Sequence, residues 1–271
     1  MKKVFLASTI MALMVSVMTF TSCTKKIVPE AEGYVQLTVN NPEVEIVTKA
    51  VEAVDDSYKV EVKQGETVVK DETYAFLKNQ FSLVPGDYSI SAYNMTAAEC
   101  LTQRKGRGVQ HFYGSTTFTI QAGIVTPVSF TCEMQNCRVS LTLDDTFKSV
   151  FKEEESIIKV YEDSDPTRVM TFPHTATLDD EDLWAYFNID DTPKLMVVIE
   201  VTRNDGAKGN YTMAVTPEAK TWHKLSIKSN STNGQADIEV LVDDSLTEKD
   251  EVQGNDKKRG REASFFIIPT R

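Results

Sequence analysis

The chain has 271 residues, of which 41% are hydrophobic and 25% are charged, a composition typical of globular rather than disordered proteins. Its 40 acidic residues outnumber its 29 basic residues, which gives a formal net charge of −11. Nucleic acid requires a positive protein face for its phosphates, so we expect no nucleic-acid partner. The length allows a sizeable core and favours two domains.

The first 22 residues have the three parts of a signal peptide. Residues 1–3 are positively charged, residues 4–20 are apolar apart from serine and threonine, and Cys23 follows two small residues. The apolar run is too short, and too soon followed by lysines, for us to expect a membrane-spanning helix.

A small residue followed directly by Cys23 resembles a lipobox of the looser kind found in Bacteroidales, with Phe20 where leucine is usual. The resemblance implies cleavage before Cys23, lipid on its thiol and a membrane as partner. Residues 1–22 are then the signal peptide and residues 23–32 a lipidated tether. The mature chain would carry 27 basic and 40 acidic residues, a net charge of −13. The alternative is an ordinary secretory signal with a coincidental cysteine.

Sequence alternation predicts short strands in the first part of the mature chain. Residues 34–39, 57–62 and 88–93 alternate apolar and polar side chains, as half-buried strands do. Further strands are expected at residues 67–69, 117–120 and 126–132, with an irregular stretch at residues 94–108.

The second part continues in the same way. The clearest hairpin has strands at residues 194–201 and 211–215 around a glycine-rich loop. A helical turn is expected at residues 146–151, and strands at residues 138–143, 156–161, 222–228 and 236–242. No alternation of strands and helices occurs, so a parallel α/β enzyme fold is not expected.

These patterns predict an all-β fold with two tandem antiparallel β-sandwich domains of Ig/transthyretin-like type. We place the first domain at residues 33–135 and the second at residues 136–243. Residues 244–271 are expected to be a disordered polar tail. Its apolar end, residues 265–268, is either frayed or available to add a strand to a sheet edge.

Several short sequence motifs resemble those of known protein families. Residues 84–93, VPGDYSISAY, are similar to the PxGxYxxxA strand of Bacteroidales surface-adhesin-like domains. FYGS at residues 112–115, FTIQAG at 118–123 and CEMQNCRVS at 132–140 resemble, in order, motifs of a fimbrillin-like lipoprotein family of unknown function, numbered 4493. His111–Phe112 stands where that family more often has Pro–Tyr. The resemblance spans residues 33–245 and implies β-sandwich domains on a lipid anchor, with no assigned reaction.

Fimbrillin-like proteins also tend to carry Thr-Lys/Arg-Ala early in the mature chain, and Thr48–Lys49–Ala50 fits this pattern. In true fimbrillins, trypsin-like cleavage of an early segment opens a groove for a partner's strand. The resemblance therefore implies a processing site at Lys49 and a donor strand at residues 265–268.

Motifs for catalysis, cofactors and metals are not found. GxSxG, HExxH and a Walker loop are missing, and Gly106–Arg107–Gly108 lacks the third glycine of a phosphate cradle. The acidic runs at residues 163–165 and 179–182 do not match an EF-hand loop and are expected to be solvated. Two sets remain without a chemical assignment: the isolated histidines His111, His174 and His223, and the cysteines Cys100, Cys132 and Cys137, which we expect to be buried free thiols.

Two patterns point to carbohydrate. Trp184, Tyr186, Phe187 and Trp222 would stack on sugar rings if exposed, although core packing is the commoner fate of such residues. Asp244–Ser245–Leu246 resembles the Bacteroidales O-glycosylation sequon, which makes Ser245 a candidate acceptor.

The leading hypothesis is a non-enzymatic cell-envelope lipoprotein of the outer membrane, displayed at the cell surface, with a binding, adhesion or scaffolding role. It would need no cofactor, and its partner would be a glycan or a protein. The alternatives are a fimbrillin-type pilus subunit that self-assembles by strand exchange, and a carbohydrate-binding accessory lipoprotein.

Overall fold

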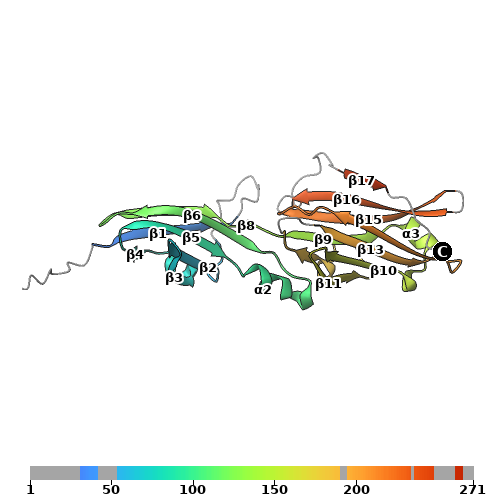
Figure 1. Ribbon diagram of the computed structural model, residues 1–271, viewed down its shortest axis with the longest axis horizontal. Helices are drawn as coiled ribbons and strands as arrows, with labels where there is room; N and C mark the ends of the chain where they lie inside the picture. Colours follow the sequence, from blue (N-terminus) through green and yellow to red (C-terminus); the bar gives the residue numbers. More distant parts are fainter. Residues whose placement is uncertain (1–30, 42–53, 190–193, 233–234, 247–259, 265–271) are drawn as a thin grey trace, which may run out of the picture. The chain divides into compact units, whose positions relative to one another are not determined.

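The computed structural model describes residues 31–41, 54–189, 194–232, 235–246 and 260–264. Strands dominate these residues and the helices are short, which confirms the all-β prediction (Figure 1). No helix among the described residues is long and apolar enough to cross a membrane.

The strands up to Met134 form the first sheet group. They are β1 (Gly33–Asn40), β2 (Lys59–Gln64), β3 (Thr67–Thr73), β4 (Phe81–Leu83), β5 (Gly86–Tyr93), β6 (Phe112–Ile120), β7 (Val125–Thr131) and β8 (Glu133–Met134). One sheet has the order β4-β1-β7 and the other has the order β3-β2-β5-β6-β8. Strand β1 pairs antiparallel with β4 and parallel with β7.

The inward faces of these two sheets share one core. Val35, Leu37 and Val39 point inward from β1, as the predicted alternation requires, and are at most 2% exposed. They pack with residues of β2, β5 and β7, among them Val60 and Ile90. The two sheets therefore pack face to face as in a β-sandwich.

The strands after Met134 form the second sheet group. They are β9 (Cys137–Leu143), β10 (Ile157–Glu162), β11 (Asp165–Phe172), β12 (Ala185–Phe187), β13 (Leu195–Thr202), β14 (Lys208–Val215), β15 (Thr221–Thr232), β16 (Gln235–Leu246) and β17 (Gly260–Ser264). The sheets have the orders β11-β10-β13-β14 and β12-β9-β15-β16-β17. The expected hairpin is β13–β14, and a second core fills the space between the sheets.

The two groups repeat one strand order. In the first group β4-β1-β7 faces β3-β2-β5-β6, and in the second group β12-β9-β15 faces β11-β10-β13-β14. The first strand of each group also pairs parallel with a late strand of that group, β1 with β7 and β9 with β15. Both groups belong to one compact unit that starts at Ala31.

The short helices lie in connections between strands. They are α1 (Tyr74–Leu77), α2 (Ala97–Thr102), η1 (Arg104–Gly106), α3 (Asp145–Val150), η2 (Glu153–Glu155) and η3 (Glu181–Leu183). Helix α3 matches the predicted helical turn. Helices α2 and η1 lie in the stretch expected to be irregular, where Thr96 and Glu99 form a capping box.

The end of the chain differs from the expected disordered tail of residues 244–271. Strand β16 continues past the predicted boundary at residue 243 to Leu246, because its register with β15 runs on without a break. Gly260–Ser264 forms β17, which pairs antiparallel with β16. This segment, GREAS, has no apolar alternation, so its sequence did not predict a strand. The apolar residues 265–268 lie outside the described residues.

Candidate functional site

We call the compact unit that starts at Ala31 the body. Its first strand, β1, is the described strand closest in sequence to the predicted anchor. Gly33 lies ten residues after Cys23. The start of β1 is fixed against the β6–β7 turn, since the Gly123 amide donates to the Glu32 carbonyl at 2.9 Å and the Tyr34 amide to the Ile124 carbonyl at 2.8 Å. A Cβ atom on Gly33 would come within 2.3 Å of a backbone oxygen, so this position requires glycine.

Strand β1 lies between neighbours that come much later in the chain. Tyr34 to Asn40 pair with Val125 to Thr131 of β7, and β4 pairs with the other side of β1. If β1 were withdrawn, β4 and β7 would border an apolar groove that Val35, Leu37 and Val39 now fill. The sheet thus has the geometry that strand exchange would require.

The three predicted site residues are placed differently. Cys23 and Lys49 lie outside the described residues, so lipidation and processing there stay predictions. Ser245 lies in β16, where it pairs with Trp222 of β15 and is not part of an extended tail. Its glycosylation also stays a prediction.

The two tryptophans meet around an arginine. The rings of Trp184 and Trp222 lie edge to face with centroids 5.3 Å apart. The guanidinium of Arg138 lies over both rings, 4.0 Å from the Trp184 centroid and 3.6 Å from that of Trp222. The Lys224 ammonium lies 4.0 Å from the Trp222 centroid, and the Trp222 indole donates to the Ser140 hydroxyl at 2.8 Å. Cations therefore occupy faces that a sugar would need.

The neighbouring aromatics are interior. Phe187 is fully buried, while Tyr186 and Trp222 are 5% and 6% exposed. Burial raises the pKa of Tyr186. These residues and Trp184 do not form the exposed platform that the carbohydrate-binding alternative requires.

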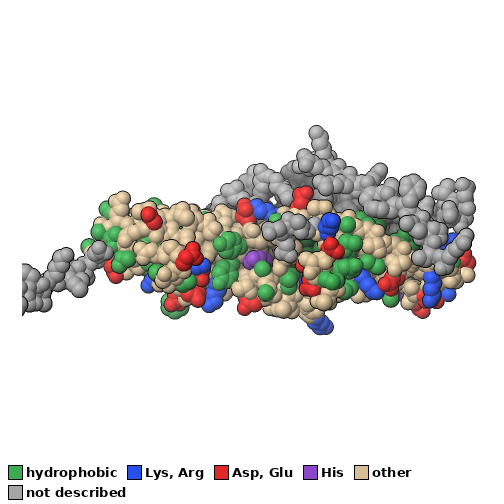
Figure 2. All heavy atoms as spheres, in the orientation of Figure 1, with side chains coloured by type: hydrophobic (Ala, Val, Ile, Leu, Met, Phe, Trp, Pro, Cys, Tyr) green, Lys and Arg blue, Asp and Glu red, His purple; other side chains and the backbone are tan. Residues whose placement is uncertain are grey.

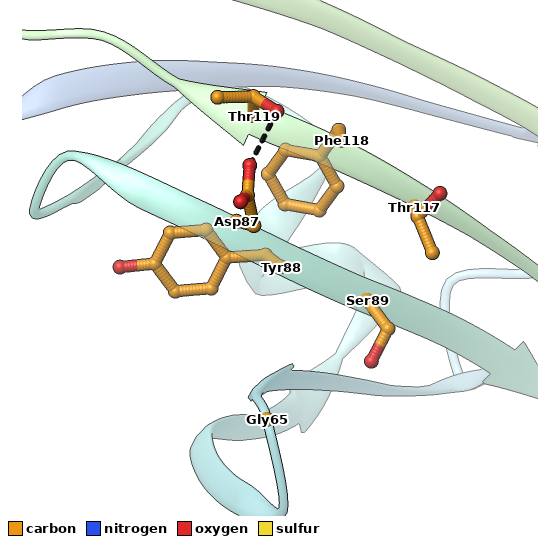
Figure 3. A pocket seen from close by; sticks show the side chains of 7 residues that line it. All are labelled: Gly65, Asp87, Tyr88, Ser89, Thr117, Phe118 and Thr119. Atoms are coloured by element: carbon orange, nitrogen blue, oxygen red, sulfur yellow. Dashed lines mark hydrogen bonds between the residues drawn. The ribbon is translucent and has the colours of Figure 1, made fainter.

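A shallow hollow of about 430 Å³ lies over β5, β6 and the β2–β3 turn (Figure 3). Its lining residues are Gly65, Asp87, Tyr88, Ser89, Thr117, Phe118 and Thr119. The rings of Tyr88 and Phe118 stack with centroids 5.7 Å apart, and the Thr119 hydroxyl donates to the Asp87 carboxylate at 2.6 Å. These side chains contact one another across the hollow, and burial raises the pKa of the Tyr88 hydroxyl.

The three cysteines are buried free thiols. Burial raises the pKa of Cys100 to about 11 and that of Cys132 to about 12. Cys132 belongs to the core of the first sheet group and Cys137 to that of the second. They do not lie in one strand, and each thiol is held in its unreactive protonated form at neutral pH.

Two of the histidines and one residue of the acidic runs have contacts within the fold. His174 lies 3.5 Å from Glu153, and His223 accepts from the Glu218 amide at 3.4 Å. Asp165 accepts bonds from Thr167, which lower the pKa of its carboxyl. Among the described residues, no three histidine, cysteine or acidic side chains come together as a metal site.

Contacts that sequence reasoning missed join the two sheet groups. From the α2–η1 segment, Arg104 donates to the Trp184 carbonyl at 3.3 Å and Arg107 to the Leu183 carbonyl at 2.6 Å. The Tyr186 amide returns a bond of 2.7 Å to the Arg107 carbonyl. Partners some 80 residues apart leave no local signal in a sequence.

Asn136 makes a second connection between the groups. Its fully buried side chain donates to the Val109 carbonyl at 2.8 Å and accepts from the His111 amide at 3.1 Å. Its carbonyl accepts from the Lys220 amide at 3.1 Å, and the Lys220 ammonium lies 2.7 Å from Glu133. The only residues between β8 and β9 are Gln135 and Asn136, so no long linker separates the groups.

A family model for a domain of unknown function, DUF4493, matches residues 31–253. The chain belongs to this family. The resemblance read from the motifs at residues 112–140 is therefore confirmed. No curated protein matches the DUF4493 chain.

Several solved structures are similar to this DUF4493 protein. A candidate cell adhesion protein from Bacteroides eggerthii matches with 9% identity and a TM-score of 0.46 over 88% of this chain and 97% of that one. A fimbrial assembly protein from Parabacteroides distasonis matches with 10% identity and a TM-score of 0.45 over 86% of this chain and 100% of that one. Likeness at this level says nothing of what this chain binds.

Proposed function

We propose that this chain is a non-enzymatic outer-membrane lipoprotein of the cell envelope, anchored by lipid on Cys23 and displayed at the cell surface. Its body, two β-sandwich domains at residues 33–135 and 136–243, serves in binding, adhesion or scaffolding for a glycan or protein partner. The observation that carries the proposal is the position of β1. The first described strand lies in the centre of a sheet, and this position supports the proposal because an N-terminal anchor would then hold the chain through its core.

Labelling with a clickable palmitate analogue in the native host tests the anchor. We expect label on the wild-type protein and on Ser22→Ala, a control that keeps a small residue before the cysteine. Cys23→Ser should abolish the label and release the protein from the membrane fraction. An unlabelled wild-type protein with a free mature N-terminus would refute lipidation.

Protease treatment of intact cells then tests surface display. Digestion of the membrane-bound protein in intact cells, with a periplasmic marker left whole, is the expected result. Protection of the protein until the cells are opened would place the body inside and refute display.

A second candidate function is a pilus subunit assembled by strand exchange. The specific observation in its favour is the apolar row Val35, Leu37 and Val39, which plugs a groove between β4 and β7. Cleavage after Lys49 would free β1 together with the tether. A strand from a second copy would then take its place.

Host cells that produce Lys49→Ala, with Lys63→Ala as the control lysine variant, test this candidate. The candidate predicts high-molecular-weight ladders and a mature N-terminus at Ala50 for the wild type and the control, and neither for Lys49→Ala. A wild-type chain that still starts at Cys23 and forms no polymer would eliminate it.

A further inference from the structure

An exposed apolar patch lies at the end of the body where β1 begins. It consists of Tyr34, Val84, Ile124 and Val125, which are 41%, 44%, 51% and 48% exposed. We call it the β1-end patch. Tyr34 pairs with Val125 across the β1–β7 register, so both side chains leave the same outer face of the sheet. Hydrophobic side chains are visible at this end of the body (Figure 2).

The patch is confined to the first row of the sheet. The next outward pair, Gln36 and Pro127, has one polar and one apolar member, and the pair after it, Thr38 and Ser129, is polar. The outer face therefore changes from apolar at the start of β1 to polar further along. The exposed apolar side chains thus gather at one end of the sheet and are bordered by polar ones, as at contact surfaces.

The second sheet group shows what happens at the equivalent place. Its counterpart of the pair Tyr34 and Val125 is the pair Arg138 and Trp222, which are 7% and 6% exposed. There the sheet end is covered, because Trp184 packs on Arg138 and the α2–η1 segment of the first group bonds to this region. In the first group, no described residue gives the β1-end patch such a cover.

The length of the chain before β1 limits how far this end of the body can lie from Cys23. Cys23 is ten residues from Gly33, and ten extended residues reach about 35 Å at most. Since Gly33 is fixed against the β6–β7 turn, the tether leaves the body beside Tyr34 and Ile124. Lipid on Cys23 would hold this end of the body within that distance of the bilayer.

We infer that the β1-end patch rests on the lipid bilayer that holds Cys23. This inference rests on the proposed lipid anchor. Tyrosine with aliphatic neighbours is the composition that favours the boundary between headgroups and acyl chains. Tether and patch together would fix the orientation of the body on the membrane. Because the contact is apolar, it forms on zwitterionic lipid and is insensitive to salt.

Hydroxyl-radical footprinting of the lipidated wild-type protein on phosphatidylcholine vesicles tests the contact. The soluble reference is the mature chain carrying Cys23→Ser. Tyr34 and Tyr113 form a matched pair because they are 41% and 39% exposed. Oxidation of Tyr34 should fall severalfold on vesicles, at low and high salt, while that of Tyr113 stays unchanged.

A fluorescent label gives a second measurement that needs no oxidation. The label is placed on Val125→Cys, or on Val169→Cys, an exposed valine of β11, as the control. Since Cys100, Cys132 and Cys137 are buried and the thiol of Cys23 would carry the lipid, the label is selective. On vesicles, the emission at position 125 should shift to shorter wavelength and be quenched by spin-labelled lipid, and the emission at position 169 should do neither.

The outcomes separate this inference from the proposed function. Protein that floats with the vesicles while Tyr34 and position 125 stay water-exposed would overturn the patch contact and leave the anchor standing. Protein that does not float would overturn both. Protection of Tyr34 in the soluble Cys23→Ser chain that rises with protein concentration would assign the patch to a second copy and overturn the bilayer as its partner.

Discussion

Strands β7 and β15 hold the same place in the two sheet groups, each parallel to the first strand of its group. Strand β15 is covered on its other side by β16 and β17, whereas β7 is the last strand of its sheet among the described residues. Strand β7 contains Pro127, and β15 contains no proline. Because proline lacks an amide hydrogen, it blunts a sheet edge against pairing. The same topology thus protects the edge of its sheet in two ways, by Pro127 in the first group and by the added strands β16 and β17 in the second.

A second difference lies at the start of the first strands. The first group exposes tyrosine and valine there, and the second group buries an arginine between two tryptophans. The repeated fold therefore places these residues at equivalent positions in the two groups. The side chains at these positions determine whether the end of the sheet is covered by the chain itself or is left exposed.

Matched truncations in the two cores test whether the two sheet groups are equally stable. Of the variants proposed, they have the largest expected effect. Leu37 of β1 and Leu141 of β9 hold equivalent inward positions and are both almost fully buried. Leu37→Ala and Leu141→Ala should each lower the free energy of unfolding by about 2–5 kcal/mol.

Two probes of urea unfolding separate these variants. Both tryptophans lie in the second sheet group, so fluorescence follows that group while circular dichroism follows both. We expect Leu141→Ala to move the fluorescence transition fully and Leu37→Ala to move it little. Equal fluorescence shifts would show that the two groups unfold as one unit.

Arg138→Ala tests the covered end of the second group. Loss of a desolvated cation from two tryptophan faces should cost about 2 kcal/mol or more and change the fluorescence of both rings. Arg138→Lys is the control, since it keeps the charge but loses the flat stacking surface. Its free energy of unfolding should lie between that of the wild type and that of Arg138→Ala. If Arg138→Ala were as stable as the wild type, the packing of Arg138 on the two tryptophans would not stabilise this end of the second sheet group.

Asn136→Ala tests the connection between the groups. The change leaves the Val109 carbonyl and the His111 amide without their partner, at a cost of about 1–3 kcal/mol. Asn136→Asp restores an acceptor for His111 but no donor for Val109, so it should recover part of the loss. The measurement is the separation between the circular dichroism and fluorescence midpoints, which should widen. An unchanged separation would argue against Asn136 as a connector.

Pro127→Val has the smallest expected effect on stability, less than about 1 kcal/mol, because Pro127 lies on the exposed face. It restores an amide hydrogen at the β7 edge, so we expect self-association that rises with concentration in sedimentation velocity. Ser129→Val, on the same exposed face, adds apolar surface without a new amide and should remain monomeric. Association of both variants would assign the effect to hydrophobicity instead.

Local patterns predicted most of the strands. The alternation at residues 34–39 predicted β1 because its inner side chains enter a core and its outer ones do not. Strand β9 alternates in the same way, yet Arg138 and Ser140 are buried on its other face. Their cover comes from Trp184 and Trp222, which lie distant in sequence, so period alone could not show it.

Two elements of the structure, α2 and β17, were not predicted from the sequence, for different reasons. Helix α2 had a readable signal, the capping box of Thr96 and Glu99, although its six residues are too few for helical periodicity. Strand β17 had none, because GREAS becomes a strand only through the backbone of β16. The predicted anchor, Cys23, precedes the described residues, so its chemistry depends on the motif alone.

The place of β1 has a mechanical consequence for a protein tethered through its N-terminus. A pull on the tether would act along β1, whose backbone is bonded to β4 on one side and β7 on the other. The load would run parallel to the strands, so the bonds of both ladders would be strained in shear together rather than opened one after another. A body held by this strand would resist being torn from its anchor by flow, and it would yield, when it did, by losing β1 as a whole.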